Sequence, residues 1–346
     1  MADFSNSYYE ARKCFLTACE RHTCSRLKAL HLSCGRDLYM DFALLGASGS
    51  ENLLVHVSGT HGVEGFVGSA IQSKILRGGC ELPEGVAVLF IHAVNPYGMA
   101  ELRRVNENNV DLNRNFLAEG ESFSGAPDLY AEICDVINPV ADLSDEAVLG
   151  LTELYSFEEL QVAILTGQYD YPQGLYYGGA KHEESTTLFS DNISDYLSGV
   201  KRVLGLEVHS GLGEFASQML LTSFSDSAKL TRRQCEQLLG ESLIEDAADV
   251  GGYPVRGGLK EAVVRNYADR QVTWVVQEFG TFDPVQMLLA LRAENYWYHK
   301  GVDAQHESRL ALLEAFCPSD ERWRAEVLRQ GVSAFNTGLS FLSSLH

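Results

Sequence analysis

The chain has 346 residues, 45% of them hydrophobic, which is enough for one large α/β domain with a sizeable core. A formal net charge of −20 argues against bulk attraction to nucleic acid or to anionic membranes, because both need a basic face. No segment reaches the roughly 20 apolar residues of a membrane-spanning helix, and residues 1–35 show no secretory signal pattern. We therefore expect a soluble, cytoplasmic protein that binds neither nucleic acid nor membrane; its oligomeric state stays open.

The first half of the chain alternates between strand-like and helix-like patterns. Two β-rich runs, 27–33 and 39–45, flank a turn-forming Gly-Arg-Asp and predict an antiparallel hairpin. Four apolar runs then predict buried strands: 53–57, 86–94, 203–208 and 272–276. The first of them leads into a segment whose apolar residues recur at helical spacing, 65–76. This order predicts an α/β domain with a twisted mixed sheet flanked by helices.

Two other regions complete the expected single domain, 1–346. The C-terminal part, about 284–346, is helical, with helices expected at 284–298, 307–316 and 320–345. The span of about 117–199 is the least regular and reads as an insertion. It contains a Tyr- and Gly-rich stretch, 167–179, which fits either a flap over a site or a surface excursion packed on its own tyrosines.

A histidine and a carboxylate stand three residues apart directly after the first apolar strand. On the first turn of a helix His61 and Glu64 face the same way, so both can reach one metal ion. The HxxE spacing alone is weak evidence, because a chain of this composition contains about one such match by chance. Its position between a strand and a helix is what favours a metal site.

Two further candidates lie at the ends of buried strands. His209 follows the run 203–208, and Glu278 follows the run 272–276. Ligands of open α/β sheets gather outside the carboxyl ends of the strands, so these side chains are expected at one edge. Two histidines and one carboxylate suffice for a catalytic zinc with a fourth position for water, and Glu278 could take a proton from that water. Alone, each residue is more often structural; together they indicate a hydrolytic metal site.

A polar segment follows the strand 86–94. It contains Asn95-Pro-Tyr-Gly98 and then the string RVNENNVDLNRNF, which begins at Arg104 and includes Arg114. Guanidinium groups bind carboxylates in a bidentate manner. The segment therefore suggests a substrate with a free carboxylate.

The ordered set of HxxE, NPxG, RxNxxxVDLNRNF, a strand-end His-Ser and a late strand-end Glu resembles the zinc carboxypeptidase superfamily of M14-type metallocarboxypeptidases. The resemblance covers roughly residues 53–280. The strings HGVEGF, GQYxxPxGLYYGG and HSGLG are most similar to its DUF2817 branch. The resemblance implies a single domain on a twisted mixed sheet with helices on both sides.

The resemblance also implies roles for the metal-site residues. His61, Glu64 and His209 would be the ligands of one Zn²⁺ ion. Glu278 would be the general base that activates the zinc water. Asp111 would orient His61 through its other ring nitrogen.

Substrate-binding roles follow in the same way. Arg104 would polarise the scissile carbonyl group and stabilise the oxyanion, and Asn113 and Arg114 would hold the substrate's terminal carboxylate. The segment YPVRGG makes Tyr253 the candidate that closes over the substrate, with Tyr267 as the fallback. Lys260 stands where the family lines the pocket for the terminal side chain and would favour an acidic residue. An ordinary exposed lysine on a loop is the alternative.

We therefore expect a zinc metallocarboxypeptidase that acts on small peptides or a peptide tail. An N-acyl amino acid deacylase of the aspartoacylase or succinylglutamate desuccinylase type is the alternative, and a non-catalytic metal- or peptide-binding relative is a third reading. Val63 inside the HxxE and Asn109 in the DLNRN segment depart from the family pattern. Neither touches a ligand, so they leave metal binding intact and put substrate details in doubt.

Overall fold

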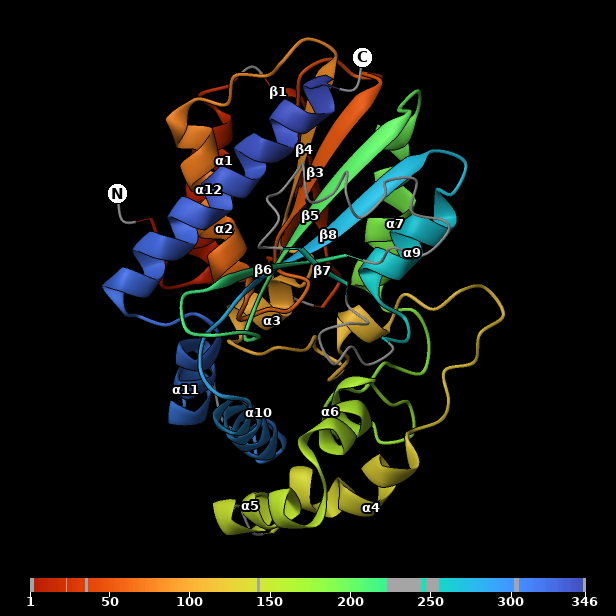
Figure 1. Cartoon of the computed structure of the whole chain (residues 1–346), viewed down its shortest axis with the longest axis vertical. Coiled ribbons are helices and arrows are strands. Elements are labelled where there is room, and N and C mark those ends of the chain that lie inside the picture. Colours follow the sequence, from red (N-terminus) through yellow and green to blue (C-terminus); the bar gives the residue numbers. More distant parts are fainter. Residues whose placement is uncertain are drawn as a thin grey trace.

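The computed structural model describes residues 3–22, 24–34, 37–141, 144–222, 244–246, 255–301 and 305–344. Its centre is one eight-stranded mixed sheet with strand order β1-β2-β4-β3-β5-β8-β6-β7 (Figure 1). The strands are β1 (Cys24–His31), β2 (Tyr39–Leu45), β3 (Asn52–Val57), β4 (Val86–His92), β5 (Arg202–Ser210), β6 (Gln218–Thr222), β7 (Ile244–Asp246) and β8 (Gln271–Phe279).

The four apolar runs form the middle of this sheet. β4, β3, β5 and β8 are neighbours and run parallel, and every residue of β3 and β4 is buried. Parallel strands are covered on both faces, which explains why these runs are apolar throughout rather than alternating. The predicted antiparallel hairpin is also present as β1 and β2, and it joins the sheet through β4.

The helices are α1 (Tyr8–Cys19), α2 (Gly65–Gly78), α3 (Pro96–Ala100), the short 3₁₀ helix η1 (Leu112–Arg114), α4 (Asp128–Ile137), α5 (Asp145–Leu154), α6 (Phe157–Leu165), α7 (Glu184–Leu197), α9 (Leu259–Asn266), α10 (Pro284–His299), α11 (Glu307–Phe316) and α12 (Glu321–Ser344). One face of the sheet packs on α1, α2 and α12, and the other on α7 and α9 (Figure 1). The expected single α/β domain is therefore confirmed.

The boundaries of the predicted helices agree closely with the structure. The helix expected at 65–76 is α2, and the three expected C-terminal helices are α10, α11 and α12. In the described part of the chain, no helix is long and apolar enough to cross a membrane.

The region 117–199 is more regular than the sequence indicates, because it contains α4, α5, α6 and α7. The first three do not cover the sheet. They lie beyond the carboxyl end of β8, across from α10 (Figure 1). Arg292 of α10 donates from Nε to the carbonyl of Val136 at 2.7 Å, which ties α10 to the end of α4. The helices α4, α5, α6 and α10 therefore lie at the edge of the sheet where the candidate site residues converge.

Candidate metal centre and its cavity

A tightly packed loop carries His61 and Glu64 from the end of β3 to the start of α2. The backbone N–H of Gly62 donates to the carbonyl of Arg104, and that of Val63 donates to the carbonyl of Arg103, both at 3.0 Å. A Cβ atom at Gly62 would lie 2.1 Å from the carbonyl carbon of Gly98, so only glycine fits. Val63 is fully buried in the core, which gives this departure from the family pattern a packing role.

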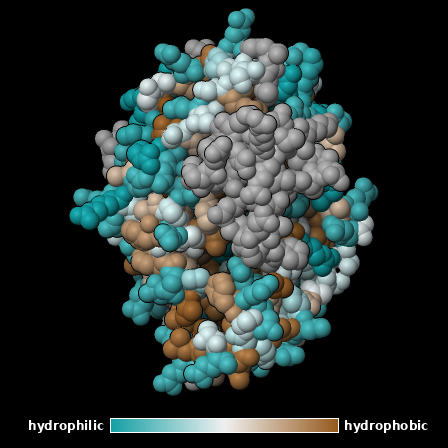
Figure 2. Space-filling model, viewed as in Figure 1, coloured by the Kyte–Doolittle hydropathy of each residue, from teal (hydrophilic) through white to brown (hydrophobic). Residues whose placement is uncertain are grey.

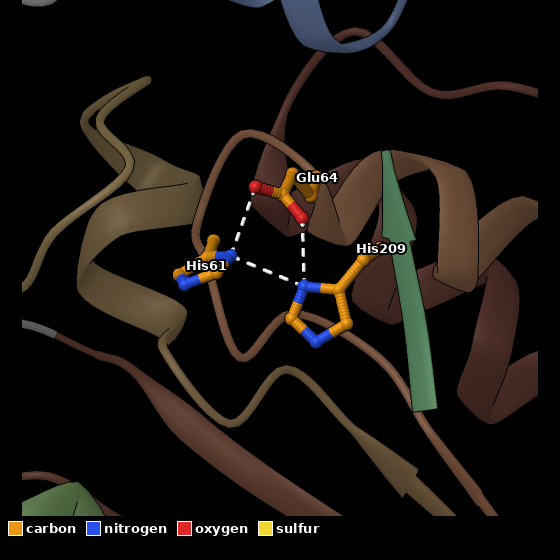
Figure 3. Close-up of side chains that lie close together, drawn as sticks. All are labelled: His61, Glu64 and His209. Atoms are coloured by element: carbon orange, nitrogen blue, oxygen red, sulfur yellow. Dashed lines mark hydrogen bonds and ion pairs between the residues drawn. The ribbon is translucent and has the colours of Figure 1, made fainter. Parts of the chain in front are cut away.

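The structure brings His61, Glu64 and His209 together, with one ligand atom of each within 4.8 Å of the others (Figure 3). The Nδ1 atoms of the two histidines are 3.2 Å apart. His61 Nδ1 lies 2.9 Å from Glu64 Oε1, and His209 Nδ1 lies 2.9 Å from Glu64 Oε2. Tetrahedral zinc with Zn–N bonds of about 2.0–2.1 Å has ligand atoms roughly 3.3 Å apart. The three groups fit one zinc-sized ion.

The far nitrogen of each histidine faces a buried carboxylate. His61 Nε2 lies 3.0 Å from Asp111 Oδ1, which is where the sequence expectation puts Asp111. His209 Nε2 lies 2.9 Å from Glu207 Oε1. Such carboxylates favour the tautomer in which Nε2 carries the proton and Nδ1 keeps its lone pair for a metal. At His61 the Nη2 atom of Arg104 also lies 2.9 Å from Nε2. Both rings therefore present Nδ1 to the same point.

Glu207 is a residue that the sequence analysis missed. It is fully buried on β5 and also accepts hydrogen bonds from Thr60 Oγ1 at 2.9 Å and from Trp274 Nε1 at 2.8 Å. The sequence could have indicated Glu207, because it lies two residues before His209 on the same strand and both side chains therefore point to the same face of the sheet. A carboxylate inside an otherwise apolar strand requires a partner, and here the partner is a candidate ligand.

The electrostatics of the centre favour a cation. Burial by itself raises the pKa of the Glu64 and Asp111 carboxyl groups, but the positive charges of His61 and Arg104 outweigh it and hold each pKa below its usual value. Burial would likewise lower the pKa of His209, but hydrogen bonds to Glu207 and Glu64 raise it well above its usual value. The carboxylates thus stay ionised and hold positive charge at this point. An imidazole proton supplies that charge, and a divalent ion bound at Nδ1 would take its place.

Glu278 lies beside the metal centre on β8. It is the register partner of His209 in the parallel pair β5 and β8. Its Oε2 is buried and has no hydrogen-bond partner among the described residues. Burial raises the pKa of Glu278 to about 7, with the Glu64 and Glu207 charges adding to the effect and His209 and Arg104 opposing it. A carboxylate with a pKa near neutrality and an unsatisfied oxygen is suited to exchanging a proton.

Arg104 contacts the metal centre directly. Its Nη1 donates to Glu64 Oε1 at 2.6 Å and its Nε donates to Asp111 Oδ2 at 3.3 Å. The guanidinium carbon lies 5.2 Å from the centre of the Tyr176 ring. Arg104 thus lines the site next to a candidate ligand, and its oxyanion role stays a prediction.

Asn113 and Arg114 lie in η1, next to the start of α9. The side-chain oxygen of Asn113 accepts from the backbone N–H of Leu259 at 3.0 Å. Arg114 donates from Nε to the carbonyl of Leu165 at 3.1 Å, and its Nη2 also donates there. Its Nη1 donates to the carbonyl of Asn113 at 2.8 Å. These bonds use three of the five N–H groups of a guanidinium and hold it in place.

Lys260 is on the first turn of α9 rather than on a loop, and its side chain is 12% exposed. Its Nζ lies 3.3 Å from Glu261 Oε1. Tyr253 lies outside the described residues. The other tyrosine of this region, Tyr267, is the C-cap of α9 and packs against the core.

One cavity of about 270 Å³ joins most of these residues. Its polar part is lined by His61, Glu64, Arg104, Asn113, Arg114, Tyr176, His209, Lys260 and Glu278. The rest of its lining is predominantly apolar. Most of it comes from α5, α6 and α10, and Leu221 of β6, Val276 of β8 and Phe316 of α11 add to it. The metal centre therefore opens into a pocket that holds three cationic side chains, three carboxylates (Glu64, Glu261 and Glu278) and a large apolar part.

The stretch 167–179 forms part of this pocket rather than an open flap. Tyr176 is 8% exposed and lines the cavity with its ring near both Arg104 and Arg114. A Cβ atom at Gly167 would lie 2.6 Å from the Arg114 side chain, so the glycine allows this close packing. The stretch therefore supports the site arginines, and Tyr176 is a second residue that the sequence analysis missed.

Known structures share this fold at low sequence identity. Bovine thrombin-activatable fibrinolysis inhibitor, in complex with tick carboxypeptidase inhibitor, superposes with a TM-score of 0.53 and 13% identity, covering 99% of this chain and 98% of that one. Carboxypeptidase A from Helicoverpa armigera gives a TM-score of 0.54 and 13% identity, covering 99% and 75%. The fold is therefore that of the zinc carboxypeptidases.

At the level of sequence, no curated protein matches this chain. A family model described as "Protein of unknown function (DUF2817)" matches residues 4–330, nearly the whole chain. The branch expected from the sequence strings is thereby confirmed: the chain belongs to the DUF2817 family and has the fold of the metallocarboxypeptidases.

Proposed function

We propose that this protein is a zinc-dependent hydrolase of an amide bond next to a free carboxylate, and that it acts as a carboxypeptidase. The observation that carries the proposal is the convergence of two Nδ1 atoms and one carboxylate beside Glu278, whose buried oxygen is unsatisfied within the described residues. A module that only bound metal or peptide would have no need of such a base. The fold similarity to metallocarboxypeptidases supports the same reaction class.

The mechanism divides between the ion and the chain's own residues. A zinc ion held by His61, Glu64 and His209 would supply Lewis acidity, lowering the pKa of a water molecule and polarising a carbonyl group. Glu278 accepts the proton of the attacking water and returns it to the leaving amine. Asp111 and Glu207 keep both imidazoles in the tautomer that presents Nδ1.

The substrate carboxylate is placed by the cations of the cavity. Arg114 is held by backbone carbonyls with part of its fork left for a ligand, and Lys260 lines the same cavity. Arg104, next to Glu64, is suited to stabilising the negative charge that develops on the scissile carbonyl oxygen. Deacylation of an N-acyl amino acid would use the same groups, and the apolar part of the cavity is the observation that favours it as a second candidate.

The test is hydrolysis of peptides varied at the C-terminal residue, alongside N-acyl amino acids, by zinc-loaded and chelator-treated protein. Zinc-dependent release of single C-terminal residues supports the carboxypeptidase. Zinc-dependent cleavage of the N-acyl amino acids alone would show that the protein is a deacylase and not a carboxypeptidase. If zinc-loaded protein cleaves neither set, the proposal is wrong.

A further inference from the structure

Three helices, α5, α6 and α10, supply most of the apolar part of the cavity. From α6, the cavity is lined by Phe157, Leu160, Gln161, Ile164 and Leu165. These positions follow the i, i+3, i+4, i+7, i+8 spacing of one helical face. The face is about 12 Å long at 1.5 Å per residue, and its far end adjoins Arg114 through the carbonyl of Leu165.

The helices α5 and α10 add their own apolar faces. Val148 and Leu151 come from α5, and Met287, Leu288 and Leu291 come from α10.

The α10 wall also reaches the metal centre. A Cβ atom at Gly211, two residues after His209, would lie 3.1 Å from the terminal methyl group of Met287. The apolar lining thus extends from the metal centre between α10 and the α5–α6 pair.

This apolar region continues to the outer surface. Figure 2 shows apolar side chains gathered on the lower part of the visible face, where Figure 1 places α5 and α10. Phe157, which lines the cavity, is itself 58% exposed, and Leu154 of α5 is 74% exposed. The largest exposed apolar patch of a monomeric soluble protein is often a binding site. The cavity has cations beside the metal centre and an aliphatic wall that continues to the surface. It therefore fits a ligand with an anionic group at one end and an apolar chain at the other.

We propose that the substrate carries a long aliphatic acyl chain, as in an N-acyl amino acid or an N-acylated short peptide. The carboxylate binds near Arg114 and Lys260, the amide bond lies at the metal centre, and the acyl chain lies between α10 and the α5–α6 pair. This inference rests on the proposed hydrolase function and names its substrate class. In the reaction, water adds to the acyl carbon, the C–N bond breaks, and the products are a carboxylic acid and a free amine.

The experiment uses N-acetyl, N-octanoyl and N-dodecanoyl glutamate, together with unacylated peptides that end in glutamate, and zinc-loaded protein. Both kcat/KM for hydrolysis and the dissociation constants of acetate, octanoate and dodecanoate, by calorimetry, are measured. We expect affinity to rise roughly threefold to fourfold per buried methylene group until the wall is filled. Phe157→Ser and Leu288→Ser should each weaken dodecanoate binding about tenfold or more. Val162→Ser is the matched control, because Val162 lies on α6 and is 39% exposed but is absent from the cavity lining among the described residues.

The two measurements separate this inference from the proposed function. Hydrolysis at equal rates for acetyl and dodecanoyl substrates, with dodecanoate unbound, overturns the acyl-chain inference and leaves the hydrolase standing. Chain-length-dependent binding without hydrolysis of any substrate supports the acyl site and overturns the hydrolase. An equal gain from apolar side chains in unacylated peptides would show that the wall binds peptide instead, and would refute the inference.

Discussion

Replacing Glu207 with Gln should weaken zinc binding without touching a ligand. Oε1 of Glu207 accepts from both His209 Nε2 and Thr60 Oγ1, and Oε2 accepts from Trp274 Nε1. A Gln side chain has one oxygen, so either orientation turns its NH₂ group toward a donor. The loss of a carboxylate behind a metal-binding histidine typically costs 10- to 100-fold in affinity, about 1.4–2.7 kcal/mol. One buried donor left without an acceptor costs about 1–3 kcal/mol of folding stability in addition.

The assay is a zinc titration against a chromophoric chelator, combined with chemical denaturation. Glu294→Gln is the matched control, because Glu294 is a buried carboxylate that pairs with Arg103 at 2.7 Å and is not one of the metal-binding groups. It should lose stability but bind zinc normally. Equal zinc affinity for Glu207→Gln and the wild type, with the same stability loss as the control, would refute the role of Glu207.

Three other changes give distinct readouts. Glu278→Gln should lower kcat by about 100-fold or more while zinc affinity, measured by the same titration, is retained. Burial raises the pKa of Glu278 to about 7, and the charge of a bound divalent ion would lower it, so wild-type kcat/KM should fall as the pH drops below about 7 and Glu278 becomes protonated; a profile that stays flat into acid would exclude Glu278 as the base. Lys260→Ala should abolish any preference for acidic terminal residues in competition assays; an unchanged preference removes Lys260 from specificity. Gly62→Ala should cost about 3 kcal/mol or more in denaturant unfolding, whereas Gly150→Ala, with open space around it, should cost little.

The sequence predicted the parts of the fold that depend on local pattern. The buried strands β3, β4, β5 and β8 and the C-terminal helices are long, uniform patterns, and their boundaries agree closely with the structure. β6 was missed because only Met219, Leu220 and Leu221 are apolar in its five residues, whereas the runs that predicted the four buried strands are richer in apolar residues. The helices α4, α5 and α6 lie in the span that the sequence indicates as the least regular, because each is only nine or ten residues long and offers a short apolar pattern.

The site residues divide in the same way, into those indicated by the nearby sequence and those whose place depends on contacts with distant segments. His61 and Glu64 are neighbours in the sequence, and strand ends indicated His209, so the structure's grouping of all three agrees with the sequence prediction. The place of Tyr176 was not predictable, because it depends on contacts with Arg104 and Arg114 from a distant segment. The roles predicted for Arg104 and Lys260 concern a substrate, and they stay predictions until one is tested.

The loop before α2, in which only glycine fits at position 62, affects how tightly a metal ion is bound. Its backbone hydrogen bonds to the carbonyl groups of Arg103 and Arg104 fix two ligands and the neighbouring guanidinium as one rigid unit. The conformational entropy of ordering these groups is thus lost when the chain folds, and little of it remains to oppose ion binding. The fold thus holds the metal ligands in place before the ion binds. Substitutions that loosen the loop should therefore speed the release of the ion more than they slow its capture.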